Sequence, residues 1–141
     1  MATWQFTLAV IPRGFRGNID QPWQEVNIDE KDINHLTRLF PPSKSWSSNL
    51  KIFGIEDGTC ISVWSENGKP MSIIVRLDMR TVQPEDIDNI LKFVNSIKGV
   101  FQDEDGHQIE PEQQTLLVAM KTSRAQLFVK NPSEFFSSLQ Q

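Results

Sequence analysis

The chain has 141 residues, of which 38% are hydrophobic and 23% charged, and its formal net charge is −4. This size and balance are typical of one globular domain with a single core, so we expect residues 1–141 to form one domain. Without a basic stripe to neutralise phosphates, the chain is not expected to bind DNA or RNA. No apolar run approaches the roughly 18 residues that span a bilayer, so we predict no membrane association.

Cysteine usage and the N-terminus bear on the compartment. Cys60 is the only cysteine, which excludes an intramolecular disulfide and a CxxC motif. The first residues lack the basic region and the long apolar region of a signal peptide. A reducing, cytoplasmic setting fits both observations.

The first predicted strand spans residues 3–11, where polar and apolar residues alternate and then give way to an apolar run. A loop rich in Pro and Gly follows, and we expect its aromatic residues, among them Trp23, to pack on the core. Asp29 can cap a helix over about 30–40, since apolar residues recur there at helical spacing and Pro41-Pro42 prevents its continuation.

Two turn dipeptides, Asp57-Gly58 and Asn67-Gly68, divide the next segment into strands near 50–55, 59–65 and 70–80. Two-residue loops would pair residues whose numbers sum to 115 in the first hairpin and to 135 in the second. This register predicts one face directed at the core, made of Phe53, Ile55, Cys60, Trp64, Met71, Ile73, Val75, Leu77 and Met79. The opposite face would carry Ile52, Ile61, Val63, Ile74, Arg76, Asp78 and Arg80.

The C-terminal half predicts further helices, of which 84–98 has the clearest signals: Pro84 at its start, acidic residues in its first turn and an apolar stripe. A short hairpin through Val100-Phe101 and Ile109 follows, and then helices over 112–121 and 132–140. The fold class predicted is α+β, with a mainly antiparallel sheet that contains the three-strand meander and packs against helices.

Motifs for chemistry are scarce. His35 and His107 have no second histidine or cysteine at ligand spacing, so we expect no metal site. Nucleotide-binding and hydrolase motifs are absent from the sequence, so we expect no cofactor and assign no catalytic residue. The acidic run 103–105 resembles a calcium loop only superficially, because Pro111 falls inside the twelve-residue window, and a solvated turn is the simpler interpretation.

One constellation could bind something. Arg76, Asp78 and Arg80 alternate along a predicted strand, where they would form an ionic ladder, a phosphate or carboxylate clamp, or part of a protein interface. With Ile61 and Ile74 they make the candidate interface or anion site. The apolar residues of that face need a cover, which a terminal segment, a second copy of the chain or a foreign protein would supply.

A further pattern includes Ser45-Trp46-Ser47, Glu56-Asp57-Gly58, Val63-Trp64 and Arg76-Leu77-Asp78 with Arg80. With these residues the chain resembles an uncharacterised family of small bacterial proteins of about 140 residues, which tends to have Trp at the position of Phe53. The resemblance covers about two thirds of the chain and is weakest before residue 28. It implies a bacterial cytoplasmic α+β domain and transfers no activity and no site.

These observations favour a non-enzymatic protein-interaction module, of which an immunity or antitoxin-like protein is one form. Small size, the missing catalytic set and a net charge of −6 over residues 85–112 support it. The alternative is a small anion-binding protein or an enzyme, in which Arg76 and Arg80 hold an anion while Asp78 or His107 handles a proton. A subunit of a larger assembly is a third possibility.

Overall fold

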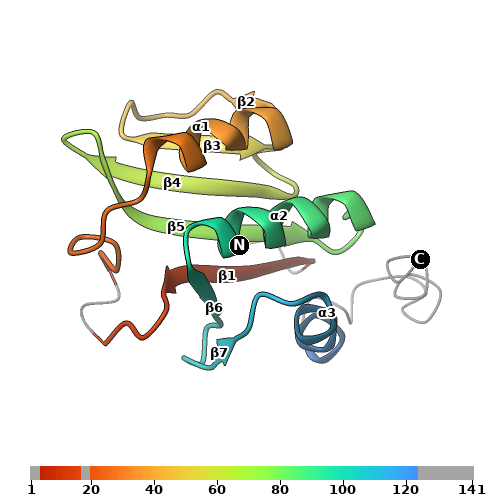
Figure 1. The fold of residues 1–141 in the computed structure, drawn as a ribbon. Coiled ribbons are helices and arrows are strands. Elements are labelled where there is room, and N and C mark those ends of the chain that lie inside the picture. The colour runs from red at the N-terminus through yellow and green to blue at the C-terminus, as the bar shows by residue number, and fades with distance from the viewer. Residues whose placement is uncertain (1–3, 17–19, 124–141) are drawn as a thin grey trace.

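A computed structural model describes residues 4–16 and 20–123. In this part of the chain, one antiparallel sheet of seven strands packs against three helices (Figure 1). The predicted α+β fold is therefore confirmed. The helix predicted over 132–140 lies outside the described residues.

The strands follow the order β2-β3-β4-β5-β1-β6-β7 across the sheet. The N-terminal strand β1 pairs with β5 on one side and β6 on the other, which joins the predicted meander β3-β4-β5 to the C-terminal hairpin. Their bounds are β1 Gln5–Pro12, β2 Pro42–Ser43, β3 Leu50–Gly54, β4 Cys60–Glu66, β5 Lys69–Asp78, β6 Gly99–Gln102 and β7 Gln108–Ile109.

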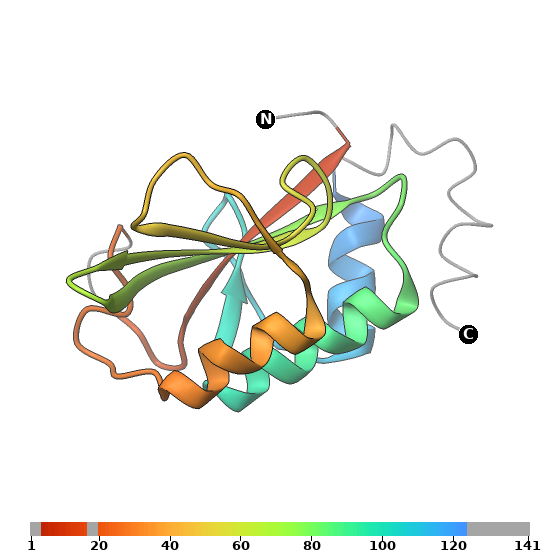
Figure 2. The same ribbon diagram turned by 90° about the horizontal axis from the view of Figure 1, so that it is seen from above.

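The helices are α1 Glu30–Leu39, α2 Pro84–Ser96 and α3 Gln113–Thr122. Asp29 caps α1 as predicted, because its carboxylate accepts from the amide of Lys31. At α2, Gln83 and Asp86 form a capping box. Figure 2 shows α1 and α2 on one side of the sheet, while the loops 44–49 and 55–59 rise on the other.

The core lies between the helices and one face of the sheet. It is built from Leu8 and Val10 of β1, the inward residues of the meander, and the apolar stripe of α2. Trp23 is fully buried there, and its indole Nε1 donates to the carbonyl of Val10 at 2.7 Å, which confirms that the loop before α1 packs an aromatic residue into the core.

The predicted register is wrong in the first hairpin, because its loop has three residues and not two. The amide of Ile55 donates to the carbonyl of Thr59, so the loop is Glu56-Asp57-Gly58. Gly54 has a φ of +115°, which only glycine adopts readily. The residue numbers of paired positions therefore sum to 114 and not to the predicted 115, as in Phe53 opposite Ile61.

The second hairpin starts as predicted and then shifts by one residue. Asn67-Gly68 forms the two-residue turn with positive φ at both positions, and Glu66 pairs with Lys69. A bulge then leaves Met71 without a paired residue on β4, and its carbonyl accepts from the amide of Trp23.

The two shifts turn β4 over. Ile61 and Val63, predicted on the second face, are buried in the core, whereas Cys60 and Trp64 lie on the other face. Ile55 and Met71, also predicted to face the core, are not part of it; Ile55 flanks the hairpin loop and is 67% exposed. No helix among the described residues has the length and apolar character needed to cross a membrane.

Candidate functional site

Among the described residues, no helix packs on the sheet face opposite α1 and α2, and we call it the helix-free face (Figure 2). Directly paired residues point to the same side of a sheet, so the register defines its rows. One row consists of Ile52, Ser62, Ile74, Ala9 and Gln102, and a second of Gly54, Cys60, Arg76 and Thr7. A third begins with Leu50, Trp64 and Ser72.

Two loops place apolar side chains at opposite ends of β3 on this side. Trp46, in the loop before β3, is 77% exposed, and its ring lies 6.0 Å from the ring of Trp64. Ile55, in the loop after β3, is the other strongly exposed apolar residue of the two loops. The sequence pattern flagged Trp46 only as part of a motif, although an aromatic residue within a serine-rich segment is itself a signal of an exposed contact.

The Arg76, Asp78 and Arg80 constellation does not converge on one point. Asp78 is buried and accepts from the Arg80 guanidinium through both carboxylate oxygens, at 3.1 and 3.0 Å. This pairing raises the pKa of the Arg80 guanidinium. Arg80 also lies 3.9 Å above the ring of Trp4, so its positive charge is shared between a carboxylate and an aromatic face.

Arg76 is directed elsewhere. Its Nη1 donates to the carbonyl of Glu56, which ties β5 to the loop 55–59, while its Nε is shielded from solvent and has no partner among the described residues. Of the other predicted site residues, Ile74 lies half-buried on the helix-free face and Ile61 lies in the core. The predicted set is thus divided into a structural pair, Asp78 with Arg80, two residues of the helix-free face, Arg76 and Ile74, and one core residue, Ile61.

Cys60 lies on the helix-free face directly opposite Arg76 and is buried. Burial raises the pKa of the thiol, and the Arg76 guanidinium opposes this increase in part. A thiol held in its protonated form is a poor nucleophile. The expectation that Cys60 is buried is confirmed, although on the opposite face from the one predicted.

Both edges of the sheet are short. The edge strands β2 and β7 have two residues each, and Pro42 in β2 lacks an amide donor. The hydroxyls of Ser43 and Ser45 donate to carbonyls at the outer edge of β3 and so take the place of missing strand donors. Such edges resist strand addition by another chain, which leaves a face rather than an edge for contacts.

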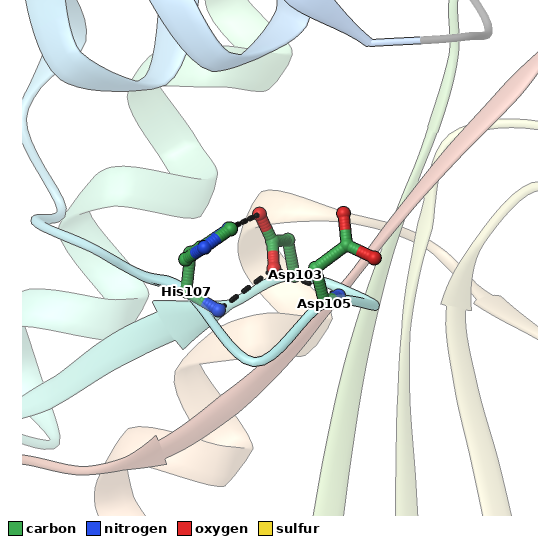
Figure 3. A group of neighbouring side chains, drawn as sticks. All are labelled: Asp103, Asp105 and His107. Carbon is green, nitrogen blue, oxygen red and sulfur yellow. Dashed lines mark hydrogen bonds and ion pairs between the residues drawn. The ribbon is translucent and has the colours of Figure 1, made fainter.

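The closest approach to a metal-ligand set among the described residues is at the β6–β7 turn, where Asp103 lies between Asp105 and His107 (Figure 3). One oxygen of Asp103 accepts from the backbone amides of both residues, at 3.0 and 2.8 Å. The other oxygen is 3.4 Å from His107 Nδ1. The carboxylate therefore closes the turn, and this local role accounts for the cluster.

A second surface pair joins distant parts of the chain. Arg13, just after β1, donates through both terminal nitrogens to the carboxylate of Glu110, at 3.0 and 2.8 Å. The hydrogen bond lowers the pKa of Glu110. Because each side chain is committed to the other, the pair fastens the segment after β7 to the end of β1 and leaves little capacity for a ligand.

Comparison with known proteins returned no family model, no curated protein and no solved structure that matches this chain.

Proposed function

We propose that this chain is a protein-binding module that contacts its partner through the helix-free face. The observation that carries the proposal is Trp46, which is 77% exposed and rests against Trp64 on that face. Tryptophan and arginine are the residues most enriched among those that dominate binding energy at protein interfaces. Arg76, which is half-buried, lies on the same face.

The arrangement of the face supports a protein partner over a small substrate. Half-buried Ile74 and the side chains of Ser62 and Ser72 give a mixed apolar and polar surface, and the short edges of the sheet disfavour strand addition. A net charge of −4 favours a basic partner through long-range attraction. Neutralisation of a basic toxin inside a bacterial cell is one form of this function, and the lone, unpaired thiol of Cys60 suits that reducing compartment.

The test variant is Trp46→Ser. The control variant is Val118→Ser, which also replaces an exposed apolar side chain by serine, but on α3 and away from the helix-free face. Each variant and the wild type are immobilised and exposed to lysate of the organism that carries the gene. We expect one stoichiometric protein bound to the wild type and to Val118→Ser, and lost with Trp46→Ser. Equal capture by all three proteins would refute the proposal, provided that their denaturation curves agree.

A second copy of the chain is the alternative partner, and light scattering separates the two. A wild-type dimer that Trp46→Ser converts into a folded monomer would assign the face to self-association. A wild-type monomer leaves the face to a foreign partner.

A further inference from the structure

A cleft of about 390 Å³ opens at the β2–β3 edge of the sheet, between α1 and the segment 42–48. Ile33, Pro42 and Phe53 contribute apolar wall to it. The volume falls in the range of small-molecule sites, which combine an apolar wall with a few polar groups. Trp46 does not line this cleft, although Leu50 and Ile52 of the helix-free face do, so the cleft borders the proposed protein contact.

Four side chains of the lining have hydrogen-bond donors that no described residue accepts. They are the Asn34 amide, the Ser47 and Ser48 hydroxyls and the Lys51 ammonium. Other serines of the lining differ, since Ser43 and Ser45 donate to carbonyls of β3. The free donors come from a helix, a loop and a strand, and so they approach the cleft from different elements.

The lining of the cleft carries a single charge. Lys51 is the only charged residue of the lining, and it has no carboxylate partner among the described residues. The sequence range 33–55, which includes the whole lining, contains Arg38, Lys44 and Lys51 and no acidic residue, although the chain is acidic overall. A lone positive charge in the lining favours an anionic ligand at this place.

We propose that this cleft binds a small organic phosphate with an apolar body about the size of one aromatic ring. A phosphate has several terminal oxygens that accept donors from different directions, and lysine binds it as a point charge. A planar carboxylate is better matched by the two-pronged donor set of arginine, which the lining lacks. The apolar wall formed by Ile33 and Phe53 would hold the body.

The probe is phenyl phosphate, titrated into the ¹⁵N-labelled protein while backbone amide shifts are recorded, with inorganic phosphate and phenol titrated separately. We expect saturable shifts centred on residues 33–53, and tighter binding of phenyl phosphate than of either fragment. Shifts centred on another region, or no saturable shifts, would overturn the site. Equal affinity for inorganic phosphate or for phenol would overturn the ligand class.

Three variants locate the interaction. Lys51→Gln should weaken binding about tenfold, the usual effect of losing a hydrogen bond from a charged group. Asn34→Trp, at an exposed position of α1, should abolish binding by filling the cleft. Lys92→Gln, the same change on α2, should leave the affinity unchanged. Unaltered binding by Lys51→Gln, or an equal loss with Lys92→Gln, would overturn the proposal.

Discussion

Gly54 determines which side chains reach the helix-free face, and its substitution by alanine tests that assignment. Gly54 ends β3 with a φ of +115°, and a Cβ added to it would lie 2.5 Å from the carbonyl oxygen of Thr59 and 3.0 Å from the Cα of Cys60. Real Cβ atoms do not approach backbone this closely. Gly54→Ala must therefore either strain the hairpin or change its loop.

The magnitude follows by comparison with Gly68→Ala in the second hairpin. Gly68 has a φ of +77°, but nothing lies within 4 Å of its added Cβ, so that variant suffers backbone strain alone, about 1 kcal/mol. Gly54→Ala adds a backbone overlap, and we expect a loss of about 3 kcal/mol or more in the free energy of unfolding. The entropy that alanine removes from the unfolded chain is the same in both variants and cancels in the difference.

Urea denaturation of the wild type and both variants measures this difference directly. If Gly54→Ala is as mild as Gly68→Ala, the three-residue loop is wrong. The two-residue register would then turn β3 over relative to β4 and bring Phe53, in place of Ile52, to the helix-free face beside Ser62.

Three further predictions concern buried side chains. Cys60 should react with Ellman's reagent far more slowly in the folded than in the unfolded protein. Because burial raises the pKa of its thiol, the stability that Cys60 contributes is complete below the unfolded pKa of 9.0 and is lost as the pH rises through the folded pKa; Cys60→Ala should remove this pH dependence of the free energy of unfolding. Trp23→Ala should lower the free energy of unfolding, measured by urea denaturation, by about 3–5 kcal/mol, because Trp23 is fully buried. Trp64 is only half-buried, so Trp64→Ala should lower it clearly less, and the reverse order would contradict the fold. Asp78→Ala should reduce the free energy of unfolding by about 2 kcal/mol and so lower the thermal midpoint, because the backbone amide and the guanidinium of Arg80 lose their acceptor. An unchanged midpoint would show that the Asp78–Arg80 pair does not stabilise the fold.

Local sequence signals predicted the elements well, because each depends on a few neighbouring residues. Asp29 and the two prolines after Phe40 bound α1, Pro84 begins α2, and Asn67-Gly68 forms the turn expected of it. Each of these features depends on the backbone conformation that the residue type itself prefers, so it can be predicted from a short stretch of sequence.

The facing of the strands could not be predicted, because it depends on single-residue shifts. Asp57-Gly58 fits a two-residue loop or the end of a three-residue one, and only the positive φ of Gly54 distinguishes them. The bulge at Met71 comes with a long-range bond from the Trp23 amide. Since side chains alternate along a strand, each shift exchanges the two faces, and so the candidate site lost Ile61 and gained Trp64.

The cleft escaped prediction for a different reason. Its lining comes from α1, the serine-rich segment and β3, and no short motif links them. The detectable signal is the run of residues 33–55 without an acid in an otherwise acidic chain. The serine-rich segment 43–48 has no helix or strand pattern in the sequence, whereas the hydroxyls of Ser43 and Ser45 complete the edge of β3.

The two proposed sites meet in the segment 42–49, and this predicts that their ligands affect each other. Ser47 and Ser48 line the cleft, while Trp46 of the same loop contacts Trp64 on the helix-free face. A phosphate held by the serines would restrict the loop that presents Trp46, so occupancy of the cleft should change the affinity for the protein partner.

By linkage, the partner must change the affinity for phenyl phosphate by the same factor. Calorimetric titration of each ligand with and without the other measures both factors, and Asn34→Trp, which fills the cleft, should remove the effect of phenyl phosphate on partner binding. Two independent affinities would show that the loop does not connect the sites.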